Sequence, residues 1–507
     1  MTDINSIDRE KSRSDEPIFD SNLKKRLIPS SVTKTLETHD GELTYTATAG
    51  YLDLFEENIG HEIAQEATVK ARVFLTTYVA QNTSHESSDE GSASRPVIFL
   101  FNGGPGSSSA WLHLGLFGPR IVNPVEKDGT TPLAPPYHLR DNPNSPLAYA
   151  DLVVIDAIST GYSRVVPNER ENQYHDADAD IEATAEIIRL WITQHRRWNS
   201  PLYIAGESYG VLRGSAVSAR LAIRHGIYLN GLILISSPIT TGRMGFEAGS
   251  ILGYQAFFPT YAAVSHYHGH YRGRSLADVI AEAEEFTDTV LLQALHQGNR
   301  LRGDKRKQVV SRYAELTGLR EEFVDRANLR ITPPQFRAEL LRTRGLVLGR
   351  NDGRFTGWDA DPLASVPEVD PSEQVLHGAF AAGINSYLRE ELGYENDLSY
   401  ELNTDRVLPW RIPQGFHRSP FNALPALSEA LRTNRTLKVL YQVGHYDLCT
   451  PFWGAISDVA LLEIPQELRH NIRLSEFDSG HMIYVDEASR IKESEDIRQF
   501  INESQHL

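Results

Sequence analysis

A serine, an aspartate and a histidine that each follow a short apolar run are the residues best placed to do chemistry in this chain. Ser208 lies in the pentapeptide GESYG at 206–210, between the apolar residues 202–205 and a helical pattern. A serine between two glycines at a strand-to-helix turn is typical of a nucleophile elbow, because residues without a β-carbon let the strand and the helix approach closely. Glycine and serine also fill ordinary turns, so the pentapeptide is a weak signal by itself.

The chain offers Ser208 a base and an acid further along. A serine nucleophile needs a base within hydrogen-bond reach, and the base needs an acid that orients its ring. Asp447 closely follows the apolar residues 439–443, and His481 follows residues 472–477. Both lie where a strand should end, so we predict that they share one sheet edge with the serine. The order Ser, Asp, His is that of the α/β-hydrolases. Asp447 could instead cap the helix that follows it.

A glycine-rich stretch, NGGPGSSS at 102–109, follows another apolar run at 97–101. A loop at this place in the chain supplies one backbone N–H group to an oxyanion hole, and the residue after the nucleophile, here Tyr209, supplies the other. Glycine-rich loops also bind phosphate, but this one lacks the Gly-Lys-Ser/Thr ending and the Rossmann spacing. The sequence therefore favours an oxyanion hole over a phosphate site.

The elements that must position these residues are visible as apolar patterns. Six short apolar runs occur at 97–101, 152–155, 202–205, 232–235, 439–443 and 472–477. Such runs are typical of strands buried on both faces of a parallel sheet. Residues 178–198 show helical spacing, whereas 42–55 and 70–80 alternate as antiparallel edge strands do. We predict an α/β fold of the α/β-hydrolase type, with a mostly parallel central sheet and helices on both faces.

The same patterns divide the chain into segments. Residues 1–28 are charged and aperiodic and predict a flexible tail, and the polar stretch 82–94 predicts an exposed loop. Residues 29–239 and 373–507 form the two parts of the core. Between them, residues 240–372 are helix-rich, and we expect a helical cap over the carboxyl ends of the strands, where open α/β sheets bind ligands. The helical patterns of this insertion lie at 276–295, 307–316, 321–327 and 334–344.

Composition limits the partners of the protein. The 507 residues are 40% apolar and 23% charged, as in ordinary soluble proteins. The net charge of −17 argues against nucleic acid or an anionic membrane as a partner. No apolar run approaches the ~18 residues of a membrane-spanning helix. A single cysteine, Cys449, excludes an intrachain disulfide framework, and the polar N-terminus has no apolar signal-peptide core. We therefore expect a cytoplasmic protein, of open oligomeric state.

Three closely spaced histidines, His266, His268 and His270, are the main candidates for a metal site. On an extended segment, alternate histidines could share a metal ion. No acidic or thiol partner is near them in the sequence, so a polar surface is the better interpretation. We expect neither a metal nor an organic cofactor.

Four segments resemble the motifs of one family, the serine carboxypeptidases. They are NGGPGSSS at 102–109, GESYG at 206–210, GHYDLCTP at 444–451 and GHM at 480–482, in the order of the family. A fifth segment, DAISTGYS at 156–163, is loosely similar to another stretch of the family and is one residue shorter. The lack of a signal peptide and the long helical insertion look more like the bacterial or intracellular branches than the vacuolar ones.

The resemblance implies a role for each matching residue. These are the nucleophile Ser208, the base His481, the orienting acid Asp447, the oxyanion donors Gly104 and Tyr209, and the carboxylate-binding pair Asn102 and Glu207. In the family, this pair binds the terminal carboxylate of the substrate. Alternatively, Glu207 supports the elbow by pairing with Arg213, one turn into the next helix.

The chain departs from the family pattern at three positions. Ser107 stands where the family motif usually has a cysteine, and His445 stands for the first aspartate of a Gly-Asp-x-Asp motif. A second glutamate that supports carboxylate binding in well-known members falls on Leu116 here. The family resemblance therefore implies the triad more directly than the carboxylate site.

Together these patterns predict an enzyme that removes the last residue of a peptide substrate. Ser208 would attack the terminal peptide carbonyl with help from His481, without a metal, and give an acyl-enzyme that water hydrolyses. The same residues could serve an esterase or an acyltransferase. A catalytically inactive binding protein on this fold is the less favoured alternative.

Overall fold

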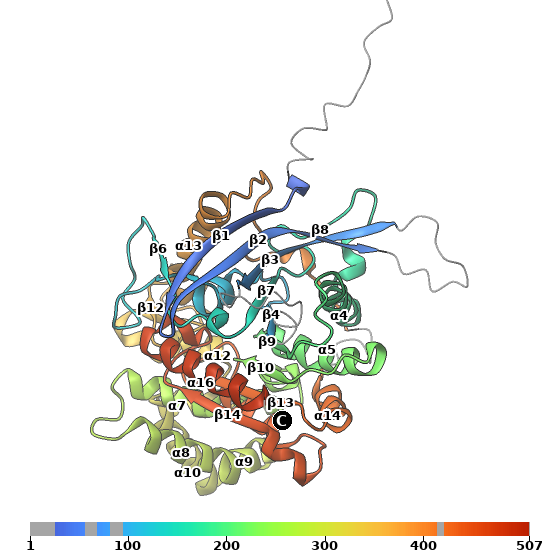
Figure 1. The fold of residues 1–507 in the computed structure, drawn as a ribbon. Coiled ribbons are helices and arrows are strands. Elements are labelled where there is room, and N and C mark those ends of the chain that lie inside the picture. Colours follow the sequence, from blue (N-terminus) through green and yellow to red (C-terminus); the bar gives the residue numbers. More distant parts are fainter. Residues whose placement is uncertain (1–25, 56–67, 82–94, 413–419, 506–507) are drawn as a thin grey trace, which may run out of the picture.

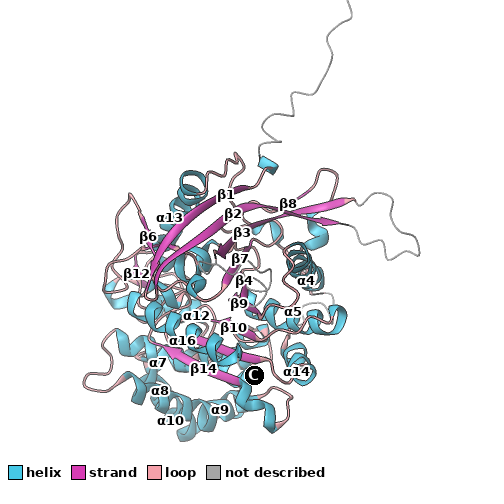
Figure 2. Cartoon of the chain, viewed as in Figure 1, coloured by secondary structure: helices cyan, strands magenta, loops and turns pink. Residues whose placement is uncertain are grey.

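The computed structural model describes residues 26–55, 68–81, 95–412 and 420–505 (Figure 1). Most of the expected N-terminal tail and the whole expected loop 82–94 lie outside the described residues. The described chain is built around one large sheet, and Figure 2 shows helices on both sides of it. None of its helices combines the length and the apolar character that a bilayer crossing needs.

The sheet runs in the order β1-β2-β3-β7-β4-β9-β10-β13-β14, with β8 paired to β3. Its six strands from β7 to β14 are parallel, and β1, β2 and β3 add antiparallel pairs at one edge. The strands are β1 (Ser30–Thr38), β2 (Gly41–Phe55), β3 (Val69–Ala80), β4 (Val97–Phe101), β7 (Asp151–Ile155), β8 (Arg164–Val165), β9 (Leu202–Glu207), β10 (Gly231–Ile235), β13 (Lys438–Gly444) and β14 (Ile472–Phe477). All six apolar runs are therefore confirmed as parallel strands.

Alternate residues of the central strands face two separate cores. Along β4, Phe99 packs into one core and Ile98 and Leu100 into the other. The neighbouring strand β7 divides in the same way, with Val153 on the first side and Leu152 on the second. Because both faces are covered, residues 97–101 of β4 and 152–155 of β7 are all apolar, and this is why they read as unbroken apolar runs. The predicted α/β-hydrolase fold is confirmed.

Helices from different parts of the chain cover the two faces (Figure 1). The first core takes α4 (Ala177–Gln194), α5 (Tyr209–His225) and α14 (Leu424–Thr433). The second takes α13 (Pro371–Ser386) and α16 (Glu487–Gln505). Helix α4 ends four residues before the predicted 198, since Arg196 has a left-handed φ of 56°. The edge strand β1 was not predicted, because its sequence SSVTKTLET has few apolar residues.

The insertion between β10 and β13 is helical, as predicted. Its helices are α6 (Leu252–Ala256), α7 (Phe258–Tyr267), α8 (Leu276–Phe286), α9 (Leu292–Gln297), α10 (Gly303–Thr317), α11 (Glu321–Arg326) and α12 (Pro333–Glu339). Aromatic side chains join them: Tyr261 stacks on Phe336 at 4.2 Å between ring centroids, and Phe258 meets Tyr313 edge-on at 4.7 Å. These rings belong to the same core as α4 and α5. The role of residues 240–372 as a cap stays a prediction.

Several short elements complete the chain. The strand pairs β5 (Arg120–Val122) with β6 (Leu139–Asp141) and β11 (Val347–Leu348) with β12 (Thr356–Gly357) form two small hairpin-like sheets. Helix α3 (Ala110–Leu112) follows the glycine-rich loop, and α15 (Phe452–Ala460) follows the loop that carries Asp447. The turn between β11 and β12 reaches the loops that follow β13 and β14 at the edge of the main sheet.

Candidate active site

Ser208 occupies a sharp turn between β9 and α5. Its φ of 62° and ψ of −128° are unusual for a residue with a side chain, and such strain is held where the surroundings over-determine it. The Ser208 N–H group donates to the carbonyl of Ile235 at 2.9 Å, which ties the turn to β10. A β-carbon on Gly206 would lie 2.2 Å from the carbonyl oxygen of Gly210. Glycine at 206 is therefore required for strand and helix to approach this closely.

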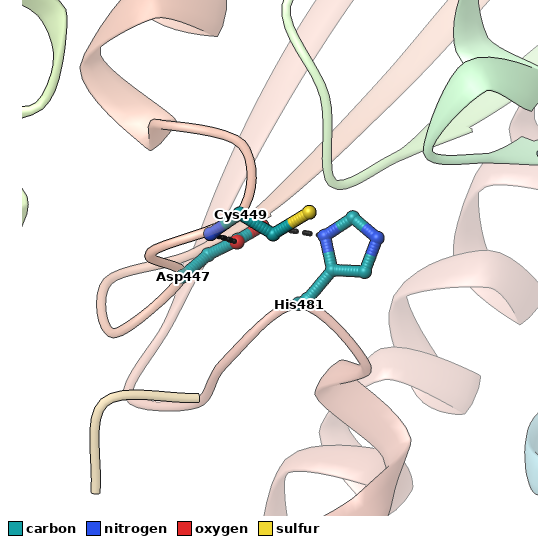
Figure 3. Close-up of side chains that lie close together, drawn as sticks. All are labelled: Asp447, Cys449 and His481. Carbon is teal, nitrogen blue, oxygen red and sulfur yellow. Dashed lines mark hydrogen bonds and ion pairs between the residues drawn. The ribbon is translucent and has the colours of Figure 1, made fainter. Parts of the chain in front are cut away.

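His481 and Asp447 lie together at the ends of β14 and β13 (Figure 3). The His481 Nδ1 atom is 2.7 Å from Asp447 Oδ2, and both side chains are buried. Burial lowers the pKa of His481, but the Asp447 charge and its hydrogen bond outweigh this, so the pKa lies above its usual value. With Nδ1 held by the carboxylate, Nε2 is the nitrogen left to exchange a proton with a nucleophile.

The carboxylate of Asp447 also serves the backbone before α15. Its Oδ1 accepts the N–H groups of Cys449 at 2.7 Å and Thr450 at 2.8 Å, and its Oδ2 accepts the Thr450 hydroxyl at 2.5 Å. The alternative of Asp447 as a helix cap is wrong, because Pro451 is the N-cap of α15 and no side chain caps that helix; Asp447 instead holds the turn before it. These donors hold the ring of His481 and its partner in one fixed orientation.

Asp447, Cys449 and His481 form the one group of potential metal ligands found among the described residues (Figure 3). Their ligand atoms lie within 4.8 Å of one another. Each oxygen of Asp447 already accepts two or more hydrogen bonds. Burial also raises the pKa of the Cys449 thiol to about 12, so it lacks the thiolate that a metal would need. The donor set fits a histidine–carboxylate pair better than a metal site.

The glycine-rich loop packs directly on the start of α5. A β-carbon on Gly103 would lie 2.2 Å from the backbone nitrogen of Tyr209. Gly104 has a φ of 101°, a value that glycine adopts without strain. Tyr209 is the first residue of α5, where backbone N–H groups have no partner within the helix. The loop and the elbow are thus packed closely against each other at the start of α5.

Asp156 anchors the far end of that loop. Its Oδ1 accepts the backbone N–H of Ser109 at 2.8 Å, and its Oδ2 accepts the hydroxyl of Tyr400. Burial raises the pKa of Asp156 to about 6, although these hydrogen bonds oppose the rise. The segment DAISTGYS at 156–163, which the sequence linked only loosely to the other motifs, therefore supports the glycine-rich loop.

Asn102 and Glu207 form a buried pair beside the serine. Asn102 Nδ2 donates to Glu207 Oε1 at 2.8 Å, and both residues are about 98% buried or more. Burial raises the pKa of Glu207 to about 7, while the nearby His481 lowers it. The alternative pairing of Glu207 with Arg213 is wrong. Arg213 instead donates to Asp180 at 2.7 Å and to the backbone carbonyl of Asn102 at 2.7 Å.

The amino-terminal part of the chain matches a known family. Residues 44–232 fit the family model described as serine carboxypeptidase. This part of the protein is similar to the serine carboxypeptidases, which confirms the resemblance drawn from the motifs. The matched residues include the glycine-rich loop and the elbow. No curated protein sequence matches the chain.

A comparison with solved structures found similar chains of low sequence identity. One is Kex1Δp, a prohormone-processing carboxypeptidase from Saccharomyces cerevisiae, with 13% identity, 90% of this chain and 91% of that chain covered, and a TM-score of 0.49. Another is a proline iminopeptidase from Mycobacterium smegmatis, with 12% identity, 94% and 99% coverage, and a TM-score of 0.36. An epoxide hydrolase from an endophytic Streptomyces has 13% identity, 93% and 96% coverage, and a TM-score of 0.33. Likeness at this level says nothing about activity.

The departures from the family pattern have clear structural settings in this protein. Leu116, which stands at the position of the second family glutamate, is fully buried in the second core. His445 pairs with Glu476 at 2.9 Å and Asp478 at 3.0 Å, away from the catalytic cavity. A different buried acid, Glu493 on α16, lies near Glu207 and was missed by the sequence analysis. The sequence KESED around it reads as an ordinary charged helix surface and offered no signal.

A cavity of about 370 Å³ brings most of the predicted residues together. Its lining includes Asn102, Gly104, Glu207, Ser208 and His481. Tyr209 is not among the lining residues, and Asp447 lies behind His481. The cavity is also lined by polar residues that the sequence analysis missed, which are Arg350, Asn351, Asp370, Glu373 and Asn403.

The three histidines of the insertion do not converge. His266 Nε2 lies 2.8 Å from the carbonyl of Arg274, His268 Nε2 lies 2.8 Å from that of Gly353, and His270 Nε2 lies 3.0 Å from that of Glu315. The segment is not extended as metal sharing would require, because α7 continues to Tyr267. Each ring fixes a different stretch of backbone, which is a structural role.

Proposed function

We propose that this protein hydrolyses the C-terminal peptide bond of peptide substrates through Ser208, His481 and Asp447. The observation that carries the proposal is the 2.7 Å contact from His481 to Asp447 at a cavity that Ser208 also lines. The family match of residues 44–232 supports the same activity. A peptide is accordingly the proposed substrate.

The chemistry follows from the three side chains. The Ser208 hydroxyl attacks the last peptide carbonyl while His481 Nε2 takes its proton, and the Asp447 carboxylate stabilises the imidazolium. Backbone N–H groups of Gly104 and Tyr209 receive the negative charge that develops on the carbonyl oxygen. The imidazolium then gives its proton to the leaving amine, which departs as the released amino acid. Water, deprotonated by His481, hydrolyses the acyl-enzyme and regenerates Ser208.

Selection of the chain end is assigned to Asn102 and Glu207. Two carboxylates at contact distance in a buried site repel each other, so one of them must be protonated. Glu207, whose pKa burial raises to about 7, is neutral below that pH and can then donate a hydrogen bond to the terminal carboxylate of the substrate. Asn102 holds the other Glu207 oxygen and fixes the direction of that donor. The helical residues 240–372 are proposed to limit access to chain ends.

A peptide-end assay tests the proposal. The wild-type protein and the Ser208→Ala variant are incubated with a peptide library in free-carboxyl and amidated forms, and mass spectrometry reports which end shortens. We expect loss of single C-terminal residues from free-carboxyl peptides, unaffected by a metal chelator, and no cleavage by Ser208→Ala. Cleavage of esters alone would favour an esterase. Shortening from the amino end, or full activity of Ser208→Ala, would contradict the proposal.

A further inference from the structure

The turn between β11 and β12, residues 349–355, docks on the loops that carry the base and the acid. The His481 N–H group donates to the carbonyl of Asn351 at 2.6 Å, and the Gly353 N–H group donates to the carbonyl of Tyr446 at 2.9 Å. A β-carbon on Gly480 would lie 2.4 Å from the β-carbon of Asp352. The turn therefore contacts the backbone of His481 and of Tyr446, the residue before Asp447.

An ion pair keeps the turn rigid. Arg354 lies 2.7 Å from Asp352, and both side chains are more than 90% buried. The same guanidinium donates to the hydroxyl of Ser479 at 3.2 Å and to the carbonyl of Asp478 at 3.2 Å. Because these contacts reach the loop before His481, the turn and the base are held as one unit.

Arg350 is the residue that this turn offers to the cavity. It lines the same 370 Å³ space as Ser208 and His481, and it is exposed. Within the described part of the chain, no ion pair or hydrogen bond occupies its guanidinium. Arginine without a partner at a cavity wall is free to bind an anion, and its planar fork matches the two oxygens of a carboxylate.

The two carboxylates that share the cavity wall with Arg350 have other partners. Asp370 Oδ1 accepts the Arg350 backbone N–H at 2.8 Å and the Ser372 hydroxyl at 2.6 Å, and Arg337 lies 3.9 Å from it. Glu373 accepts the side-chain amides of Asn351 at 3.1 Å and Asn403 at 3.0 Å. Neither acid approaches the Arg350 guanidinium within ion-pair distance, so the cation stays available to a substrate.

We propose that Arg350 binds a carboxylate of the substrate and so determines specificity. Leu116 makes the position of the second family glutamate apolar, and Arg350 supplies charge to the cavity from a different segment. The carboxylate can come from the chain end or from an acidic side chain of the substrate. This inference rests on the proposed function, because it assumes that the Ser208 cavity is where the substrate reacts.

Steady-state kinetics with matched substrates test the assignment. The wild type, Arg350→Gln and Arg350→Lys are compared on N-benzoyl dipeptides. Each dipeptide pairs phenylalanine with either Glu or Gln, and the Glu or Gln is placed first in one peptide and last in another. Hippuryl-phenyllactate serves as an ester with a terminal carboxylate, and N-benzoylphenylalanine ethyl ester as one without. If Arg350 binds an acidic side chain, Arg350→Gln raises KM about 10- to 100-fold for the Glu peptides only. If it binds the chain end, KM rises similarly for every substrate with a terminal carboxylate. Arg350→Lys should lose less in either case.

Controls separate this assignment from the proposed function. Arg344→Gln changes an exposed arginine of the same insertion that does not line the cavity, and should leave all KM values unchanged. The ethyl ester and labelling by a fluorophosphonate probe report whether Ser208 stays reactive. A wild-type enzyme that cleaves both esters but no peptide would overturn the proposed function, and hippuryl-phenyllactate would still test Arg350. Unchanged KM of Arg350→Gln for every carboxylate substrate, or an equal loss on the ethyl ester, would overturn the role of Arg350.

Discussion

Asn102 holds Glu207 by a 2.8 Å hydrogen bond from Nδ2 to Oε1, in a site buried beside the nucleophile. The amide donates to one carboxyl oxygen, and the second oxygen, Oε2, makes no well-formed hydrogen bond among the described residues, although the Tyr484 hydroxyl lies close enough to lower the pKa of this carboxyl group. Such a buried oxygen on an acid with a pKa of about 7 is suited to meet a ligand.

KM on free-carboxyl peptides should rise as the pH rises through about 7. Below that pH Glu207 is neutral and can donate to the substrate carboxylate, whereas above it the two charges repel, since its pKa is raised to about 7 by burial. Glu207→Gln keeps a neutral donor and should flatten the rise. The measurement is KM from pH 5 to 9. An ester without a carboxylate serves as control, and a flat wild-type KM would contradict the carboxylate role.

Asp447→Asn should lower kcat by about 10⁴-fold, because the amide no longer stabilises the imidazolium or its tautomer. The 2.7 Å contact to His481 is the interaction removed. Since the three residues act as one unit, the double variant Ser208→Ala/Asp447→Asn should be no slower than Ser208→Ala. Single-turnover rates on a peptide substrate would decide. Near wild-type kcat for Asp447→Asn, or additive losses in the double variant, would disagree with a triad.

Gly103→Ala should lower kcat/KM by about 10² to 10³, as loss of an oxyanion donor does. The new β-carbon would lie 2.2 Å from the Tyr209 nitrogen and force the glycine-rich loop away from the elbow. Gly378→Ala is the matched control, since that glycine is exposed on α13 and its nearest neighbour, Tyr137, is 3.6 Å away. Equal activity of the two variants would show that the loop does not act at the reacting carbonyl.

Glu493→Gln should become increasingly more stable than wild type as the pH rises from 5 to 7. Glu493 is fully buried, neither of its oxygens has a hydrogen-bond partner among the described residues, and burial raises its pKa well above the usual value of 4.5. The unfolded chain ionises this acid above pH 4.5 while the folded protein keeps it neutral. Its contribution to stability is therefore lost as the pH rises, by up to about 1.4 kcal/mol per pH unit.

Thermal unfolding of both proteins at pH 5, 6 and 7 measures this effect. The exposed Glu495, two residues further along α16, provides the control variant Glu495→Gln. A Tm difference between Glu493→Gln and wild type that does not change with pH would mean that Glu493 is not held neutral in the folded protein.

Local patterns in the sequence determined the sheet and the position of the nucleophile. The apolar runs became parallel strands because both of their faces are buried, and burial of each such side chain is worth about 1.5–3 kcal/mol. The glycines around Ser208 were readable because a strained turn and a close approach of backbones allow little else. Asp447 and His481 were found because strand ends gather at one sheet edge, and their order along the chain selected them from many acids and histidines.

Tertiary structure alone decided which polar side chains face the site and which are buried. Arg213 lies close to Glu207 in the sequence, yet it does not pair with it. Arg213 instead binds Asp180 and the backbone of Asn102, both of which come from distant segments. Arg350 and Glu493 carry no local pattern that separates them from surface charges. Arg350 reaches the cavity because its turn is hydrogen-bonded to His481, and Glu493 is buried because α16 packs on the second core. Such placements depend on contacts between residues far apart in the chain, and a pattern of neighbouring residues does not encode them.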